Sequence, residues 1–213
     1  YFEGFTHSHE LGAGYVLKSG TVFHNYVSSV DGVRNERAGG REQVLPFGHR
    51  VAYVNGSVEE LALLSKKHAL ALRVTSAQPS LLGLKPLLKT AGALSVADGV
   101  VIVAPGLGAA QFMALAADRA YTLEDGLWLR ASAPGTSFTV VAAFGATAAE
   151  AAGRARALST GDPIGDERRA SHAALTRSYL ATSDSDYNKA LNWAKAASNL
   201  FVVDEYGAGI WAG

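Results

Sequence analysis

Two carboxylates separated by one residue, Asp184 and Asp186, form the acidic pair in this sequence whose type and spacing could do chemistry. Paired acids can act as general acid and base or can hold a metal ion. The same pair directly precedes an amphipathic segment. There, Asp184 or Ser183 can accept the free N–H groups of a first helical turn, and Asp186 places negative charge at the positive end of the helix dipole. We therefore predict that both acids start a helix and are not catalytic.

The histidines are the residues that could bind a metal ion. They comprise an H-x-H pair, His7 and His9, and the scattered His24, His49, His68 and His172. A zinc site needs further ligands at a recognisable spacing, and the sequence offers none. The chain contains no cysteine, which excludes disulfides and thiolate sites, and no serine lies in a G-x-S-x-G context. We expect no metal site, no cofactor and no acyl-transfer chemistry.

A glycine-rich turn offers a nucleotide-binding motif. The β-rich segment 100–103 leads into Gly106 and Gly108, as in a dinucleotide-binding loop, but Gln111 occupies the position of the third glycine. The residues that follow again have strand character, so no strand–helix–strand unit is formed. We predict a hairpin turn, and nucleotide binding through Gly106 and Gly108 remains a third, weaker hypothesis.

A charged, glycine-rich segment at residues 32–42 lies between two β-rich segments. Polar loops of this kind are usually solvated surface connections, although binding residues are often carried on them. We predict a surface loop, and it is the best candidate outside the C-terminal segment for contact with a ligand or a neighbouring domain.

Composition limits the class of protein. The 213 residues include 19 basic and 19 acidic side chains, and 48% are hydrophobic, which is enough for one large domain with a substantial core. No basic run stands out, so the charge pattern excludes nucleic-acid and anionic-membrane partners. The uncharged stretch 99–117 is interrupted by Pro105, which favours two strands over a membrane helix. With no cysteine and no signal peptide at Tyr1, we expect a cytoplasmic protein.

The secondary structure predicted from the sequence changes from strands to helices along the chain. Short β-rich segments separated by turn residues are typical of an antiparallel β-sandwich, which we place at residues 1–145. The predicted strands are 15–17, 21–30, 50–54, 69–75, 82–88, 99–103, 111–117, 127–130 and 137–144. Thr147 and Glu150 form a capping-box pattern at the start of a helix to Leu158, and a second helix is predicted at 166–180. These two helices make a helical linker at residues 146–182.

The last predicted helix, residues 185–203, carries a wide apolar stripe. Its members are Tyr187, Ala190, Leu191, Trp193, Ala194, Ala197, Leu200 and Phe201. A stripe of this width requires a covering surface. We expect it to be buried against the sandwich or in a homodimer contact, because an exposed patch of that size promotes association.

These C-terminal residues carry a family resemblance. The run Asp186-Tyr187-Asn188-x-Ala190-Leu191-x-Trp193-Ala194-Lys195, followed by Gly209-Ile210-Trp211-Ala212-Gly213, resembles the beginning of the catalytic barrel in bacterial and archaeal glycogen debranching enzymes. Those enzymes are of the amylo-α-1,6-glucosidase type and are related to glucoamylase-like glycoside hydrolases. A looser similarity covers 69–74 through 84–88. The resemblance implies a large antiparallel β-sandwich, a helical linker and, at residues 183–213, the truncated start of an α/α toroid.

The resemblance also implies a function. The full enzyme would hydrolyse α-1,6-glucosidic bonds in an α-glucan with inversion, using two carboxylates that both lie beyond Gly213. The partner of this chain would be the C-terminal α/α barrel, and this chain would contain no catalytic residue. Trp211 is the candidate substrate-binding residue because aromatic rings stack on sugars, and the alternative is a hinge aromatic packed under a loop. A freestanding carbohydrate- or protein-binding β-sandwich without catalysis is the alternative function.

Overall fold

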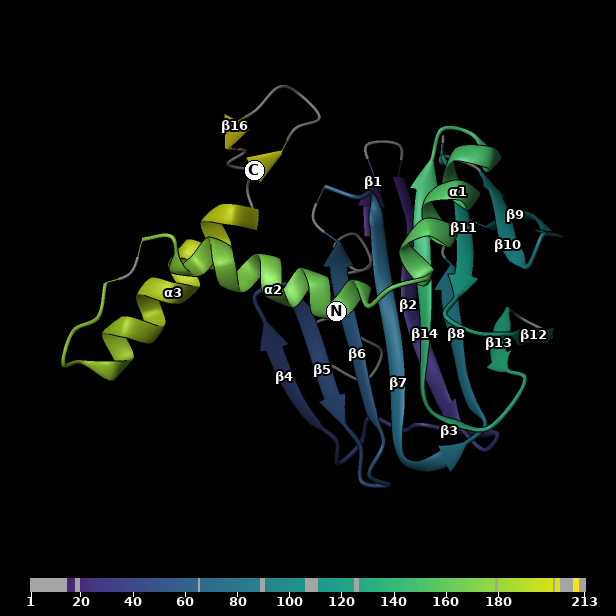
Figure 1. The fold of residues 1–213 in the computed structure, drawn as a ribbon, viewed down its shortest axis with the longest axis horizontal. Helices are drawn as coiled ribbons and strands as arrows, with labels where there is room; N and C mark the ends of the chain where they lie inside the picture. The colour runs from purple at the N-terminus through teal and green to yellow at the C-terminus, as the bar shows by residue number, and fades with distance from the viewer. Residues whose placement is uncertain are drawn as a thin grey trace.

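The protein is an antiparallel β-sandwich followed by three helices, as expected from the sequence (Figure 1). The computed structural model describes residues 15–17, 20–64, 66–88, 91–105, 111–124, 127–178, 180–200, 202–203 and 209–210. Among these residues, every strand pairing is antiparallel. The prediction of an antiparallel β-sandwich, which was based on short strands separated by frequent turns, is therefore confirmed.

The smaller sheet has the strand order β1-β2-β8-β13-β12, and β3 pairs with the other end of β2. Its strands are β1 (Tyr15–Leu17), β2 (Gly20–Val30), β3 (Val33–Arg34), β8 (Leu82–Leu88), β12 (Tyr121–Glu124) and β13 (Trp128–Ala131).

The larger sheet has the order β4-β5-β6-β7-β14-β11-β10-β9. Its strands are β4 (Arg41–Leu45), β5 (Gly48–Ala52), β6 (Val58–Leu64), β7 (Ala69–Ser80), β9 (Ala91–Ala97), β10 (Val100–Pro105), β11 (Phe112–Ala117) and β14 (Gly135–Gly145). A separate pair is formed by β15 (Val202–Val203) and β16 (Gly209–Ile210).

Seven strands, β3, β4, β6, β9, β12, β15 and β16, lie where the sequence pattern predicts no strand, and β15 falls at the end of the helix predicted at 185–203. β6 carries Glu59 and Glu60, and β9 is rich in alanine with one glycine, compositions that strands disfavour. Both strands form because neighbouring strands supply their pairing partners. Tertiary context therefore overrode local preference at these positions.

The main core lies between the two sheets. Leu72 of β7 and Val140 of β14 face Leu84 and Leu129 of the smaller sheet, and all four side chains are fully buried. Burial of each such aliphatic side chain contributes about 1.5–3 kcal/mol. This layer is the principal stabilising element of the sandwich.

A second core covers the outer face of the larger sheet. Ala71 of β7 and Val141 of β14 pack there against Ala151 and Ala155 of α1 (Ala148–Ser159) and against Ile164 of α2 (Pro163–Thr176). Both faces of β14 are thus buried, which explains its uninterrupted apolar run. The predicted linker helices therefore form a third layer on the sandwich (Figure 1).

The helices begin close to their predicted caps. Thr147 accepts a hydrogen bond from the Glu150 N–H, and Asp162 accepts one from the Gly165 N–H. Pro163 occupies the first turn of α2, where its missing N–H costs nothing, so this helix starts three residues before the prediction. α3 (Ser185–Leu200) lies beside α2 and away from both sheets (Figure 1). The domain boundaries near residues 145 and 182 remain predictions.

Thr147→Ala is expected to lower the free energy of unfolding by about 1 kcal/mol, because the cap of α1 would lose its acceptor. Urea denaturation followed by far-UV circular dichroism measures the change. Thr160→Ala at the other end of α1 removes only a hydroxyl that donates to the Ala157 carbonyl, and it serves as the control. Equal effects of the two substitutions would contradict an N-cap role for Thr147.

Candidate functional site

Several residues selected from the sequence fall outside the described part of the chain. They are Trp211, the pair His7 and His9, and the glycines Gly106 and Gly108. The strands on either side of the glycine turn are described, and β10 pairs antiparallel with β11. This pairing confirms the predicted hairpin arrangement and is not the parallel unit of a dinucleotide-binding fold.

The acidic pair at the start of α3 has the capping role predicted for it. Asp184 Oδ1 accepts hydrogen bonds from the backbone N–H groups of Asp186, at 2.9 Å, and Tyr187, at 3.0 Å. The side chain of Asp186 pairs with Lys189 within the same helix. The two carboxylates therefore complete a helix start, and among the described residues no cluster of metal-ligating side chains exists.

Part of the charged segment 32–42 is buried in the sandwich. Asn35 is buried, and only 15% of the Arg37 side chain is exposed. Arg37 lies over the Tyr26 ring at 5.4 Å and donates a hydrogen bond to Glu59 at 3.1 Å. The predicted surface loop is thus only partly solvated, because Asn35 and Arg37 pack against the residues of the sandwich interior.

Glu59 is the centre of a buried polar cluster that the sequence pattern does not indicate. The Ser28 hydroxyl donates to one of its carboxylate oxygens, and Arg37 donates to the other. Asn35 donates to Ser28 at 2.8 Å, and Asn35 in turn accepts hydrogen bonds from Asn55 and Ser57. Because both Glu59 oxygens accept hydrogen bonds, this side chain has a structural role.

Burial raises the pKa of the Glu59 carboxyl, and the Ser28 hydroxyl and the Arg37 charge act in the opposite direction. Burial also raises the pKa values of the Tyr26 and Tyr53 phenols. His49 is buried beside Tyr26, and burial, reinforced by the charge of Arg37, lowers its pKa to about 3. Glu42 lies 3.7 Å from His49 Nε2, but burial outweighs this carboxylate, so His49 is neutral at pH 7.

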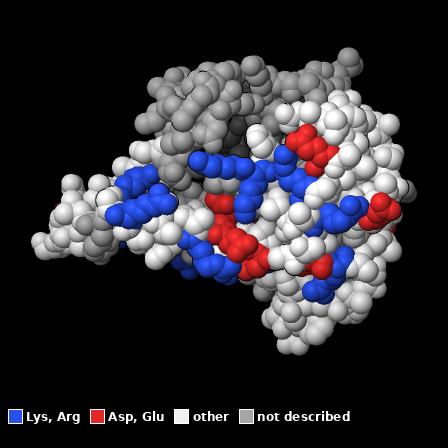
Figure 2. All heavy atoms as spheres, turned by 45° about the horizontal axis from the view of Figure 1, so that its top comes forward, with Lys and Arg blue, Asp and Glu red and all other residues white. Residues whose placement is uncertain are grey.

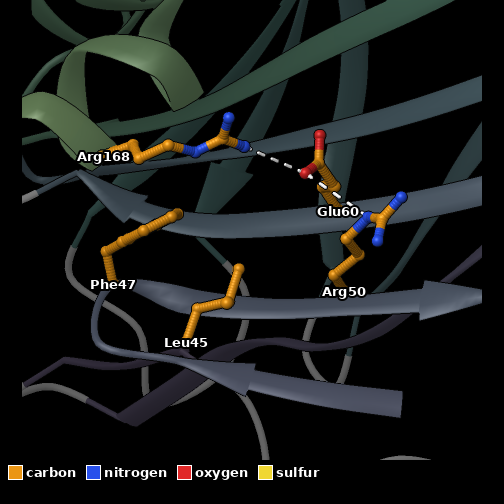
Figure 3. A pocket seen from close by; sticks show the side chains of 5 residues that line it. All are labelled: Leu45, Phe47, Arg50, Glu60 and Arg168. Carbon is orange, nitrogen blue, oxygen red and sulfur yellow. Dashed lines mark hydrogen bonds and ion pairs between the residues drawn. The ribbon is translucent and has the colours of Figure 1, made fainter. Parts of the chain in front are cut away.

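A pocket of about 440 Å³ lies between the larger sheet and α2 (Figure 3). Leu45 and Phe47 form its apolar wall. On the other side, Glu60 from β6 lies between Arg50 of β5, at 3.9 Å, and Arg168 of α2, at 3.2 Å. The pocket therefore combines an apolar wall with one fully compensated carboxylate.

The same ion pairs fix α2 on the sheet. Glu60 also lies 4.0 Å from Arg73, which bonds Asp162 at the N-cap of α2 at 2.5 Å. Arg168 lies 6.0 Å from the Phe47 ring centroid. On the face drawn in Figure 2, basic and acidic side chains of the described residues are interleaved and do not separate into patches of one sign.

Arg168→Ala is expected to destabilise the docked position of α2 by about 1 kcal/mol, because it removes an ion pair and a cation–π contact together. Hydrogen exchange of the α2 amides should then accelerate about fivefold. The matched control is Arg169→Ala, which removes only a pair with Asp166 inside the same helix. Equal acceleration in both variants would show that the contact with the sheet does not hold α2.

The apolar face of α3 is the third surface of interest. Tyr187 is 51% exposed and Trp193 is 48% exposed. The expectation that this stripe is buried against the sandwich is therefore wrong. The physical reason is that α2 extends past the sheet and α3 packs beside it, where Ala196 is buried and Lys195 donates to the Leu175 carbonyl at 2.7 Å.

Two acidic side chains of these sites lie on opposite faces of the larger sheet. Glu59 and Glu60 are consecutive on β6, so their side chains point to opposite faces of the sheet and cannot act across one substrate. Each is also engaged by arginine. No helix among the described residues is long and apolar enough to cross a bilayer.

Two solved structures are similar to this chain. A family GH92 inverting mannosidase from Bacteroides thetaiotaomicron VPI-5482 matches 84% of this chain with a TM-score of 0.59 and 12% sequence identity, over 29% of its own length. A bacterial glucoamylase complexed with acarbose matches 88% of this chain with a TM-score of 0.44 and 10% identity, over 32% of its length. No protein-family model matches the sequence, and no curated protein matches it.

The first comparison defines the class of fold. At 12% identity it establishes a shared β-sandwich architecture of the kind found within a glycoside hydrolase. The chain spans less than one third of the length of either solved chain. Activity, substrate and partners are therefore matters for proposal.

Proposed function

We propose that this chain is the non-catalytic β-sandwich and linker of a glycoside hydrolase, placed before an α/α barrel that carries out the hydrolysis. The observation that carries the proposal is the fold shared with the GH92 mannosidase, combined with the match to only 29% of that chain. The sandwich would supply a rigid platform, and the helices would connect it to the catalytic part.

The exposed apolar face of α3 supports the proposal that another part of the enzyme packs against this helix. Tyr187 and Trp193 are large side chains, each about half exposed on one helix. Exposed aromatic patches of this kind are typical of surfaces that pack against another body. In the proposal, the partner is the next helices of the barrel, with α3 as its first helix. A homodimer through this face is the alternative outcome for the isolated chain.

The proposed reaction is hydrolysis of an α-1,6-glucosidic bond in an α-glucan with inversion. Inversion requires an acid and a base carboxylate about 6.5–9.5 Å apart, on opposite sides of the sugar. The buried carboxylates of the sandwich are engaged in ion pairs, so the proposal places both catalytic acids outside this chain. Trp211 is proposed to contact the terminal sugar. The absence of cysteine fits the reducing cytoplasm, which is the proposed location.

The experiment compares the 213-residue chain with the product of the same gene extended by about four hundred residues, the size of the proposed barrel. Glucose release from isomaltose and from a limit dextrin is measured, and NMR identifies the first anomer formed. We expect no turnover by the 213-residue chain and release of β-glucose by the longer protein. Hydrolysis by the 213-residue chain alone, or a stop codon directly after Gly213, would refute the proposal.

A further inference from the structure

The sandwich contains a polar pocket of its own beside the Glu59 cluster. Its volume is about 370 Å³, at the lower end of the range of about 300–1,000 Å³ that is typical of small-molecule sites. Asn25 and Tyr26 come from β2, and Arg37 comes from the 32–42 segment. Tyr53, which follows β5, completes the buried part of the lining.

The walls of this pocket are held in place before any ligand arrives. Arg37 is fixed by Glu59 at 3.1 Å. Asn35, which also lines the pocket, is held by Asn55 at 2.8 Å and by Ser57 at 3.1 Å. A preformed arrangement of polar groups lowers the entropic cost of binding.

One buried polar group in this lining has spare hydrogen-bonding capacity. Asn25 is only 4% exposed, and its side-chain oxygen accepts the Tyr26 N–H at 2.8 Å. Its amide nitrogen makes no hydrogen bond within the described part of the chain. The NH₂ group of an amide carries two donors, so it can donate to a ligand in this pocket.

The charges around the pocket balance. Arg34 and Arg37 supply two positive charges, and Glu36 and Glu42 supply two negative charges. Arg34 and Glu36 lie 4.0 Å apart at the exposed rim. Neither an anion nor a cation meets a surplus of opposite charge here. Hydroxyl groups both donate and accept, so a neutral polyhydroxyl molecule matches a lining of amides, carboxylates and guanidinium groups.

We propose that this pocket binds one neutral sugar ring, with Asn25 donating to a ring hydroxyl and Tyr53 contacting the apolar edge of the sugar. The site goes beyond the proposed function. It lies in the sandwich itself and requires no catalytic barrel, so its test and the hydrolysis test can fail independently.

The test is an NMR titration of the 213-residue chain that follows the side-chain amide signals of Asn25. The probes are methyl α-D-glucopyranoside and methyl α-D-mannopyranoside, with inorganic phosphate and tetramethylammonium as charged comparison ligands. We expect saturable shifts with at least one sugar, with a dissociation constant on the order of 1 mM, as suits a ligand of this size. Neither charged ligand should produce them.

Two substitutions test whether the shifts arise in this pocket. Ala38 is an exposed residue of the lining, and Ala38→Trp should fill the opening and weaken sugar binding at least tenfold. Asn25→Asp should weaken it about two- to tenfold, because a carboxylate has no N–H to donate. The matched control is Ala133→Trp on the exposed β13–β14 connection, which should leave affinity unchanged. Thermal unfolding confirms that each variant is folded.

Three results would overturn the proposal. The first is the absence of a saturable Asn25 shift with both sugars. The second is binding of phosphate or tetramethylammonium more tightly than either sugar. The third is sugar affinity that folded Ala38→Trp retains in full.

Discussion

Replacing Glu59 with alanine is expected to lower the free energy of unfolding by about 3–5 kcal/mol, one of the two largest effects we anticipate in this protein. The carboxylate is fully buried and holds the largely buried Arg37 side chain. Its removal leaves a guanidinium charge without its counterion and leaves the Ser28 hydroxyl without this acceptor. Urea denaturation at pH 7 measures the loss.

A paired substitution separates this charge effect from loss of packing. Replacing both Glu59 and Arg37 with leucine should recover most of the lost stability, because no unpaired charge then remains in the interior. Glu36→Ala is the control, since Glu36 belongs to the same segment but is 75% exposed, and it should change stability by less than about 0.5 kcal/mol. An unchanged urea midpoint in Glu59→Ala would refute the structural role of the cluster.

Acidification should destabilise the protein through His49, by up to about 5 kcal/mol when the pH reaches about 3. The folded pKa of about 3 lies below the unfolded value of 6.5. Between these values the unfolded chain binds a proton that the folded chain does not, so stability is complete above pH 6.5 and is lost as the pH falls. Burial is the main cause, and the Arg37 charge adds to it.

Glu59 acts in the opposite direction over part of this range. The pKa of Glu59 in the folded protein lies above the unfolded value of 4.5. The contribution of this group to the free energy of unfolding is therefore complete below pH 4.5 and is lost as the pH rises through the folded pKa. The two effects partly cancel just above pH 4.5. The profile of the wild-type protein alone therefore understates the contribution of His49.

The His49→Gln variant isolates the histidine, because it retains a polar side chain of similar size that does not titrate. Between pH 6.5 and pH 4, the wild-type protein should lose about 3 kcal/mol more stability than this variant. Urea denaturation at half-unit pH intervals provides both curves. His68→Gln, at an exposed histidine, serves as the control for the histidine-to-glutamine change itself. Parallel wild-type and His49→Gln curves would refute a neutral, buried His49.

Much of the fold follows from signals that lie within a few residues of one another. Alternating β-rich segments predicted the sandwich, and the cap residues Thr147 and Asp184 predicted where α1 and α3 begin. The turn containing Gly106 predicted that β10 and β11 form a hairpin. Capping and turn formation depend on local hydrogen bonds, so they can be read from a short stretch of sequence.

The candidate sites were predictable only in part. The segment 32–42 is predicted from the sequence as a surface loop, with contact to a ligand or a neighbouring domain as the alternative, and in the structure several of its residues line the polar pocket. The acids Glu59 and Glu60 were not selected, because two adjacent glutamates resemble an ordinary exposed surface. Only the pairing of β6 with β5 and β7 places one of them inside the core and the other under α2.

By itself the sequence determined the class of fold, the change from strands to helices after residue 145, and the presence of an apolar face on α3. The tertiary structure decided which polar residues meet and which apolar face stays exposed. Ser28 and Glu59 are 31 positions apart, and Arg37 and Glu59 are 22 positions apart. Their interaction depends on the order of strands in the sheets, and strand order is a balance of burial and pairing over the whole chain that no local pattern encodes.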